Sequence, residues 1–151
     1  MTDRYLENLR VGDRFNSGTY TVSKSEIIRF ADAFDPQPFH LDGEAASQSI
    51  FGGLAASGWH TAAITMRLMV TSNIEIHGGL VGLGVDELRW PKAVRPGDTL
   101  QVQIEVLEIR PSRSRPDRGT MRIRSVTTNQ AGEEVLTMIS TALVPRRGEH
   151  H

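Results

Sequence analysis

The stretch ASGWHTAAITMRLMV, residues 56–70, is apolar almost all round, and His60 and Arg67 are its only ionisable groups. A helix without a polar face is predicted to be buried in a core rather than to lie on the surface. Its roughly 15 residues would give a helix of about 22 Å, which is too short to cross a bilayer but long enough to lie across a sheet. The stretch therefore predicts a central helix packed on a β-sheet.

After Gly79 the apolar residues recur with a period of two, which predicts strands. The segments with this pattern are 80–90, 97–110, 119–129 and 134–144, and a short strand ending near Val22 precedes them. Turn sequences at 95–98 and 129–134 are typical of connections between antiparallel neighbours. We therefore predict an α+β fold, with an antiparallel sheet of about five strands and the long helix on one face. The open sheet edge would invite pairing with another chain, so we expect a homodimer or a higher homo-oligomer built from it.

The length of 151 residues fits one domain, which we place at 1–149, with 150–151 as a possible tag remnant. The net charge of -1 gives no basic field, so nucleic acid is not an expected partner. The absence of cysteine rules out disulfides and thiolate metal sites. The charged N-terminal segment has no apolar signal core, and no run of residues is long enough to span a membrane. We expect a cytoplasmic protein.

The segment DPQPFHLD, residues 35–42, is predicted to be neither helix nor strand. It follows a helix that Ser23 and Glu26 are predicted to cap and that Asp35-Pro36 ends. The two prolines restrict the connection, so Asp35 and His40 could be held facing one spot as a general acid/base pair. The alternative is that Asp35 only ends the helix while His40 fills a polar gap, and spacing alone does not exclude it.

Gly58 stands eighteen residues after His40, near the start of the predicted central helix. The free N–H groups of a first helical turn, together with the helix dipole, suit a carbonyl oxygen that gains negative charge. The alternative is that the glycine only permits tight packing. No P-loop, dinucleotide fingerprint or nucleophile elbow is present.

Other candidates are weaker. A lone histidine such as His60 in an apolar helix is usually a core residue, and a metal site joining it to His40 and Asp42 would have no known motif spacing. We predict no metal site, and Asp42 is predicted to cap a short helical turn. Trp90 is predicted to end a strand with its indole over the core.

These residues resemble the MaoC-like dehydratases, or (R)-specific enoyl-CoA hydratases, of the hotdog fold. Their motif runs Asp, any residue, Asn, Pro, an aliphatic residue, His, and DPQPFH matches it at Asp35, Pro38 and His40. The position of Gly58 and the order of the elements agree as well. The resemblance covers nearly the whole chain and implies a sheet wrapped around the helix, dimers paired edge to edge, and an acyl-CoA thioester substrate.

By this resemblance, Asp35 and His40 would activate a water that adds to C3 of a trans-2-enoyl thioester, and the pair would return a proton at C2. The Gly58 N–H would hold the thioester oxygen, and no metal or redox cofactor is implied. Gln37, Phe39 and Ser57 are expected to help bind substrate around this oxyanion site.

Three departures from the family pattern stand beside the motif. Gln37 replaces the usual Asn, while Phe34 and Phe39 add bulk that favours a short, branched or aromatic acyl group. Two other functions fit the same fold. One is a thioesterase whose carboxylate activates water against the carbonyl. The other is a non-catalytic acyl-binding or assembly subunit.

Overall fold

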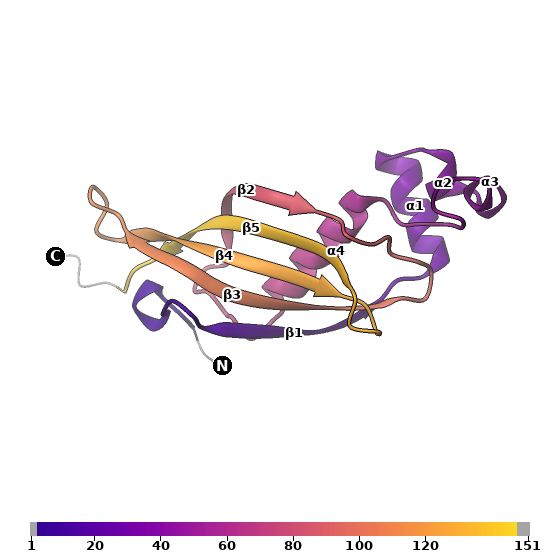
Figure 1. Cartoon of the computed structure of the whole chain (residues 1–151). Coiled ribbons are helices and arrows are strands. Elements are labelled where there is room, and N and C mark those ends of the chain that lie inside the picture. Colours follow the sequence, from indigo (N-terminus) through magenta and orange to yellow (C-terminus); the bar gives the residue numbers. More distant parts are fainter. Residues whose placement is uncertain (1–2, 148–151) are drawn as a thin grey trace.

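The computed structural model describes residues 3–147 (Figure 1). The possible tag at 150–151 and the end of the predicted domain at 148–149 lie outside the described residues. The elements in chain order are the 3-10 turn η1 (Leu6–Asn8), β1 (Arg14–Thr21), α1 (Lys24–Phe34), α2 (Pro38–Leu41), α3 (Gly43–Ser47), α4 (Gly58–Val70), β2 (Val81–Arg89), β3 (Thr99–Pro111), β4 (Arg118–Thr128) and β5 (Glu134–Pro145). No helix within residues 3–147 combines the length and hydropathy that a membrane span requires.

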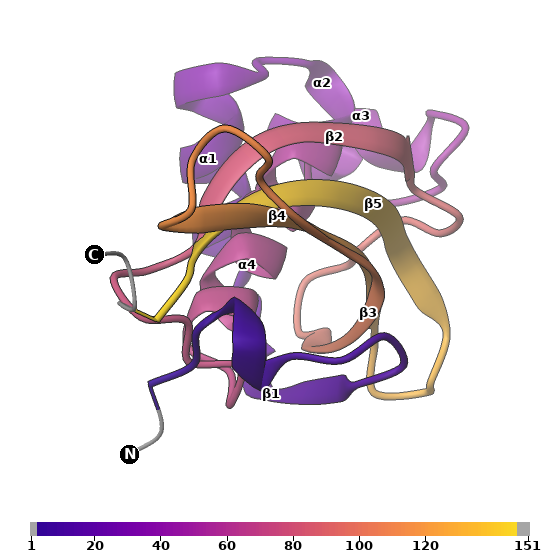
Figure 2. The ribbon, with the colours of Figure 1, turned by 90° about the vertical axis from the view of Figure 1, so that its left-hand side faces the viewer.

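One antiparallel sheet contains all five strands, in the order β1-β3-β4-β5-β2. The sheet curls around α4, which lies on its concave face (Figure 2). Inward side chains such as Ile104, Ile123 and Leu136 are fully buried, because the period of two along each strand turns them all toward the helix. The predicted α+β class, with about five antiparallel strands, is confirmed.

Helix α4 lies across the sheet as predicted, but although its sequence is apolar almost all round, only one of its sides is buried. His60, Thr61, Ile64, Thr65, Leu68 and Met69 are buried, whereas Trp59, Met66 and Val70 are exposed. A single sheet covers only the face of the helix that it contacts. The apolar residues on the opposite face have no cover within residues 3–147.

Strand β2 is an edge strand with exposed apolar side chains. Leu83 is 57% exposed and Val85 is 53% exposed. Together with Met66 of α4, these residues line a groove of about 340 Å³. We call Met66, Leu83 and Val85 the apolar flank.

The helical segment before α4 begins and ends as local chemistry requires. The Ser23 side chain caps α1 in a capping box with Glu26, and the Asp42 side chain accepts a hydrogen bond from the Glu44 N–H at the start of α3. Both predicted caps are confirmed. Residues 35–42 are a correction, because Pro38–Leu41 forms the one-turn helix α2. Pro38 occupies its first turn, where a missing N–H costs nothing.

Candidate active site

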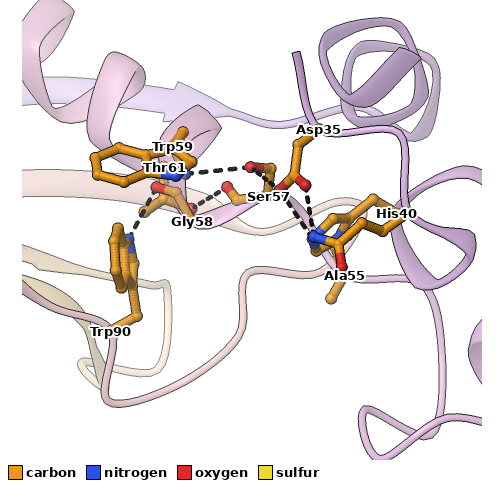
Figure 3. A network of polar contacts seen from close by, with 9 residues as sticks. Asp35, His40, Ala55, Ser57, Gly58, Trp59, Thr61 and Trp90 are labelled. Carbon is orange, nitrogen blue, oxygen red and sulfur yellow. Dashed lines mark hydrogen bonds and ion pairs between the residues drawn. The ribbon is translucent and has the colours of Figure 1, made fainter. Parts of the chain in front are cut away.

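Asp35 and His40 face each other across the turn between α1 and α2 (Figure 3). Oδ2 of Asp35 lies 3.4 Å from Nε2 of His40, and the His40 side chain is 6% exposed. Asp35 is the residue that ends α1, and α2 then turns the chain so that the histidine points back at it. The separation is longer than an ordinary N–H···O hydrogen bond, so a water molecule to one side of the pair could contact both atoms.

The other ring nitrogen of His40 is fixed by the backbone. Nδ1 lies 2.6 Å from the carbonyl oxygen of Ala55. A carbonyl oxygen only accepts, so Nδ1 carries a proton and donates it. The Phe39 ring packs edge-on against the imidazole, with centroids 4.6 Å apart. These contacts leave Nε2 as the atom that can exchange a proton in the pocket.

Two side chains donate hydrogen bonds to Asp35. The Ser57 hydroxyl donates to Oδ2 at 2.7 Å, and the Gln37 amide donates to Oδ1 at 2.5 Å. Burial alone would raise the pKa of Asp35, but these two hydrogen bonds and the nearby charge of His40 together lower it below its usual value. Asp35 is therefore ionised at neutral pH, and each oxygen keeps a lone pair for another donor.

Gly58 is the first residue of α4, so its N–H has no acceptor inside the helix. Within residues 3–147, this N–H donates no hydrogen bond to any other group either. The preceding residue, Ser57, caps the helix by accepting a hydrogen bond from the Trp59 N–H at 3.2 Å. The start of α4 thus offers a backbone donor beside the acid/base pair.

A pocket of about 280 Å³ brings these groups together. It is lined by Asp35, His40, Phe51, Ala56, Gly58, Trp59, Thr61, Trp90, Lys92, Ala93 and Val94. The wall therefore combines a carboxylate, an imidazole and a helix start with a largely apolar surface, which is a typical composition for a small-molecule site.

Gln37, Phe39 and Ser57 do not line this pocket. Gln37 and Ser57 hold Asp35, and Ser57 is fully buried. Phe39 packs between His40 and Phe51. Their contacts are therefore with the residues of the site rather than with the pocket itself.

Phe34 is 74% exposed and is absent from the pocket wall. His60 stacks on Phe30 with centroids 4.6 Å apart, and His77 pairs with Asp3. No group of three metal-ligating His, Asp or Glu side chains occurs in the described part of the chain. None of Phe34, His60 and His77 lines the pocket of the Asp35–His40 pair.

Two tryptophans in the pocket wall were missed or misplaced by sequence reasoning. Trp90 is 39% exposed and its Nε1–H donates to the Gly58 carbonyl oxygen at 2.8 Å, so the prediction that the indole covers the core is wrong. Trp59 meets it edge-on, with centroids 5.3 Å apart. Trp59 directly follows Gly58, so its place at the start of α4 could have been inferred from the sequence. Nothing in the sequence around Trp90 indicates that it packs against Gly58.

The family model described as "MaoC like domain" matches residues 8–129. The chain belongs to the MaoC-like dehydratase family. The solved structure of the MaoC-like dehydratase from Rhodospirillum rubrum is 55% identical to this MaoC-like chain, covering 95% of it and 98% of the other chain with a TM-score of 0.92. This likeness confirms the predicted hotdog fold.

Two relatives of this MaoC-like chain are similar to it in sequence over most of its length. The uncharacterized protein YdeM of Bacillus subtilis is 33% identical over 141 residues, which is 93% of this chain and 99% of YdeM. The 3-hydroxybutyryl-CoA dehydratase of Methylorubrum extorquens is 30% identical over 137 residues, which is 87% of this chain and 78% of that enzyme. The predicted family is therefore confirmed.

Proposed function

We propose that this chain is a hydro-lyase that adds water to, or removes it across, the C2–C3 bond of a trans-2-enoyl-CoA or a related acyl thioester. The observation that carries the proposal is the convergence of Asp35, His40 and Gly58 on one pocket. Further support comes from the similarity to a 3-hydroxybutyryl-CoA dehydratase. The substrate carries coenzyme A, and the proposed reaction uses no metal or redox cofactor.

In the hydration direction, Asp35 and Nε2 of His40 hold a water near C3. The water oxygen bonds to C3 while one of its protons passes to Nε2, and the C2–C3 π electrons move toward the thioester carbonyl. The oxygen of the resulting enolate accepts a hydrogen bond from the Gly58 N–H, next to the positive end of the α4 dipole. The pair then delivers a proton to C2, so that one water is added in total. Dehydration is the reverse sequence.

The test is the loss of the conjugated enoyl absorbance of crotonyl-CoA and longer enoyl-CoAs. Asp35→Asn and His40→Ala should each lower kcat by about 10²- to 10⁴-fold, the usual contribution of a general acid/base group. His77→Ala, in an exposed histidine outside the pocket, is the control and should match the wild type. The proposal fails if no enoyl-CoA is turned over, or if the Asp35 and His40 variants keep full activity.

The same samples separate the two alternatives. A thioesterase would release free thiol, which a chromogenic thiol reagent detects. A non-catalytic acyl-binding subunit would bind acyl-CoA and return it unchanged, and Asp35→Asn would then have no kinetic effect. Either result would replace the hydratase assignment.

We also propose that two copies pair through strand β2. The edge of β2 carries unpaired backbone groups, and the apolar flank beside it is exposed. Sedimentation should give the mass of two chains for the wild type and of one chain for Leu83→Asp. Val11→Asp is the control, because Val11 is 65% exposed but does not line the groove of the apolar flank. A wild-type monomer, or an intact Leu83→Asp dimer, would refute the pairing.

A further inference from the structure

Gly58 is required by a neighbouring side chain rather than by its own backbone. Its φ is not among the positive values found at six other glycines, so an L-residue could adopt its conformation. A Cβ added at Gly58 would lie 2.7 Å from Cε2 and 2.9 Å from Nε1 of Trp90. The indole therefore occupies the space that any side chain at position 58 would need.

The indole also makes a directed contact with the same residue. Nε1–H of Trp90 donates to the Gly58 carbonyl oxygen at 2.8 Å. On the other side, the Ser57 side chain is bonded to Asp35. Gly58 is thus held on both sides of its Cα, because Ser57 before it is bonded to the carboxylate and its own carbonyl oxygen is bonded to Trp90 (Figure 3).

The irregular end of β2 determines where the Trp90 indole lies. The pairing of β2 with β5 shifts register between Asp86 and Arg89, and Glu87 has a φ of 51°, in the left-handed region. A bulge of this kind redirects the side chains that follow it. A non-glycine residue in this conformation costs free energy and persists only where the surrounding structure enforces it. Trp90 follows directly after the last residue of the strand.

We infer that Trp90 is a positioning residue for the Gly58 N–H: it fixes the donor that binds the thioester oxygen and sets the space around it. The inference rests on the proposed hydratase function. Because the donor must be aimed at the oxygen as charge develops there, a small rotation of the Gly58 peptide weakens transition-state binding more than ground-state binding.

The kinetic test compares two substitutions that each remove one indole N–H from the pocket wall. Trp90→Phe keeps a ring but loses the hydrogen bond to Gly58, and it should lower kcat about tenfold with little change in KM, a fraction of the ~10²- to 10³-fold cost of losing a whole oxyanion donor. Trp59→Phe removes an indole that makes no hydrogen bond to Gly58 and should cost less in kcat. Equal kcat losses, or an effect on KM alone, would overturn the inference.

A second test needs no substrate. Gly58→Ala should lower the Tm in the wild-type background and have little effect in the Trp90→Leu background, because the clash is then gone. The Gly58 amide signal in a ¹⁵N-glycine spectrum should also shift more in Trp90→Phe than in Trp59→Phe. Additive Tm changes, or an unmoved amide signal, would refute the positioning role. If the wild type turns over no enoyl thioester while the coupling is observed, the proposed function fails and the Gly58–Trp90 contact stands.

Discussion

The Ser57 hydroxyl donates a hydrogen bond to Oδ2 of Asp35 at 2.7 Å, and Oγ of Ser57 also accepts one from the Trp59 N–H at 3.2 Å. One fully buried hydroxyl therefore both caps α4 and holds the carboxylate. Movement of either partner disturbs the other. Ser57 therefore links the helix start that carries the backbone donor to the carboxylate of the acid/base pair.

Ser57→Ala should lower both stability and activity. Loss of the cap should cost about 1 kcal/mol of unfolding free energy. It should also lower kcat, because Asp35 loses a donor that holds it in place. The matched control is Ser23→Ala, which removes the cap of α1 without touching the pocket. Chemical denaturation and enoyl-CoA kinetics check both values, and an equal loss of kcat in the two variants would contradict the role assigned to Ser57.

Gln37→Ala should move the acid limb of the activity profile to higher pH. The Gln37 amide stabilises the charged carboxylate of Asp35, so its removal raises the pKa of that group. The lowered pKa of Asp35 also stabilises the fold. This stabilisation is complete at a pH above the pKa that Asp35 has in the unfolded chain, and it is lost as the pH falls through the pKa that Asp35 has in the folded chain. Gln37→Asn, which restores the residue usual in the family motif, should move the limb less than Gln37→Ala. A profile of kcat/KM against pH measures the shift, and an unmoved acid limb in Gln37→Ala would contradict it.

His60 should make the fold sensitive to acid. It is 7% exposed, and its Nδ1 has no hydrogen-bond partner among residues 3–147. Burial lowers the pKa of His60, against the opposing charge of Glu26. The unfolded chain therefore binds more protons as pH falls through about 6.5, and the folded state loses stability there.

His60→Phe keeps a ring against Phe30 but cannot ionise. Its stability relative to the wild type should rise as pH falls from about 7.5 to about 5.5, on either side of the ordinary histidine pKa. Urea denaturation at several pH values gives this difference. His77→Phe, at an exposed histidine, serves as the control. A difference between His60→Phe and the wild type that does not change with pH would contradict the prediction.

Arg95→Ala should loosen the pocket wall. The Arg95 guanidinium donates to the carbonyl oxygens of Gly53 at 2.8 Å and Leu54 at 3.2 Å, and also to that of Phe51. This segment leads directly to Ala55, whose carbonyl orients His40. We expect the loss to cost about 1.5–3 kcal/mol, the range for hydrogen bonds to a charged group, and to lower kcat.

The control for Arg95 is Arg110→Ala, which breaks the exposed ion pair of Arg110 with Glu108, and Arg110 does not line the pocket. An exposed pair of this kind contributes about 0–1 kcal/mol. Thermal unfolding should therefore separate the two variants clearly. Equal Tm changes would show that Arg95 does not support the segment.

The sequence predicted those features that depend on neighbours along the chain. The alternation of Leu100, Val102 and Ile104 located a strand, and Ser23 with Glu26 located a helix start, because both signals are local. The one-turn helix at Pro38–Leu41 was missed, since so short an element has almost no periodicity. The spacing of Asp35 and His40 left open whether they face one spot, and the structure places them 3.4 Å apart.

Contacts between distant segments were beyond that reasoning. Trp90 packs on Gly58, which lies 32 positions earlier in the chain, and a register shift at the end of β2 directly precedes it. The exposed side of α4 could not be predicted either, because the sequence pattern of an apolar helix face is the same whether that face packs on the chain's own core or is exposed to solvent. Ser57 was expected to help bind substrate, and its hydroxyl bonds to Asp35, 22 positions earlier in the chain.

The pocket can be observed by the intrinsic fluorescence of its tryptophans. The chain has two tryptophans, Trp59 and Trp90, and both line the wall beside the acid/base pair. Light absorbed at the red edge, where tyrosine is transparent, therefore produces emission from this wall alone. Arrival of a ligand can be followed by stopped-flow fluorescence without dye or labelled substrate, and the Trp59→Phe variant assigns the remaining signal to the indole that contacts Gly58.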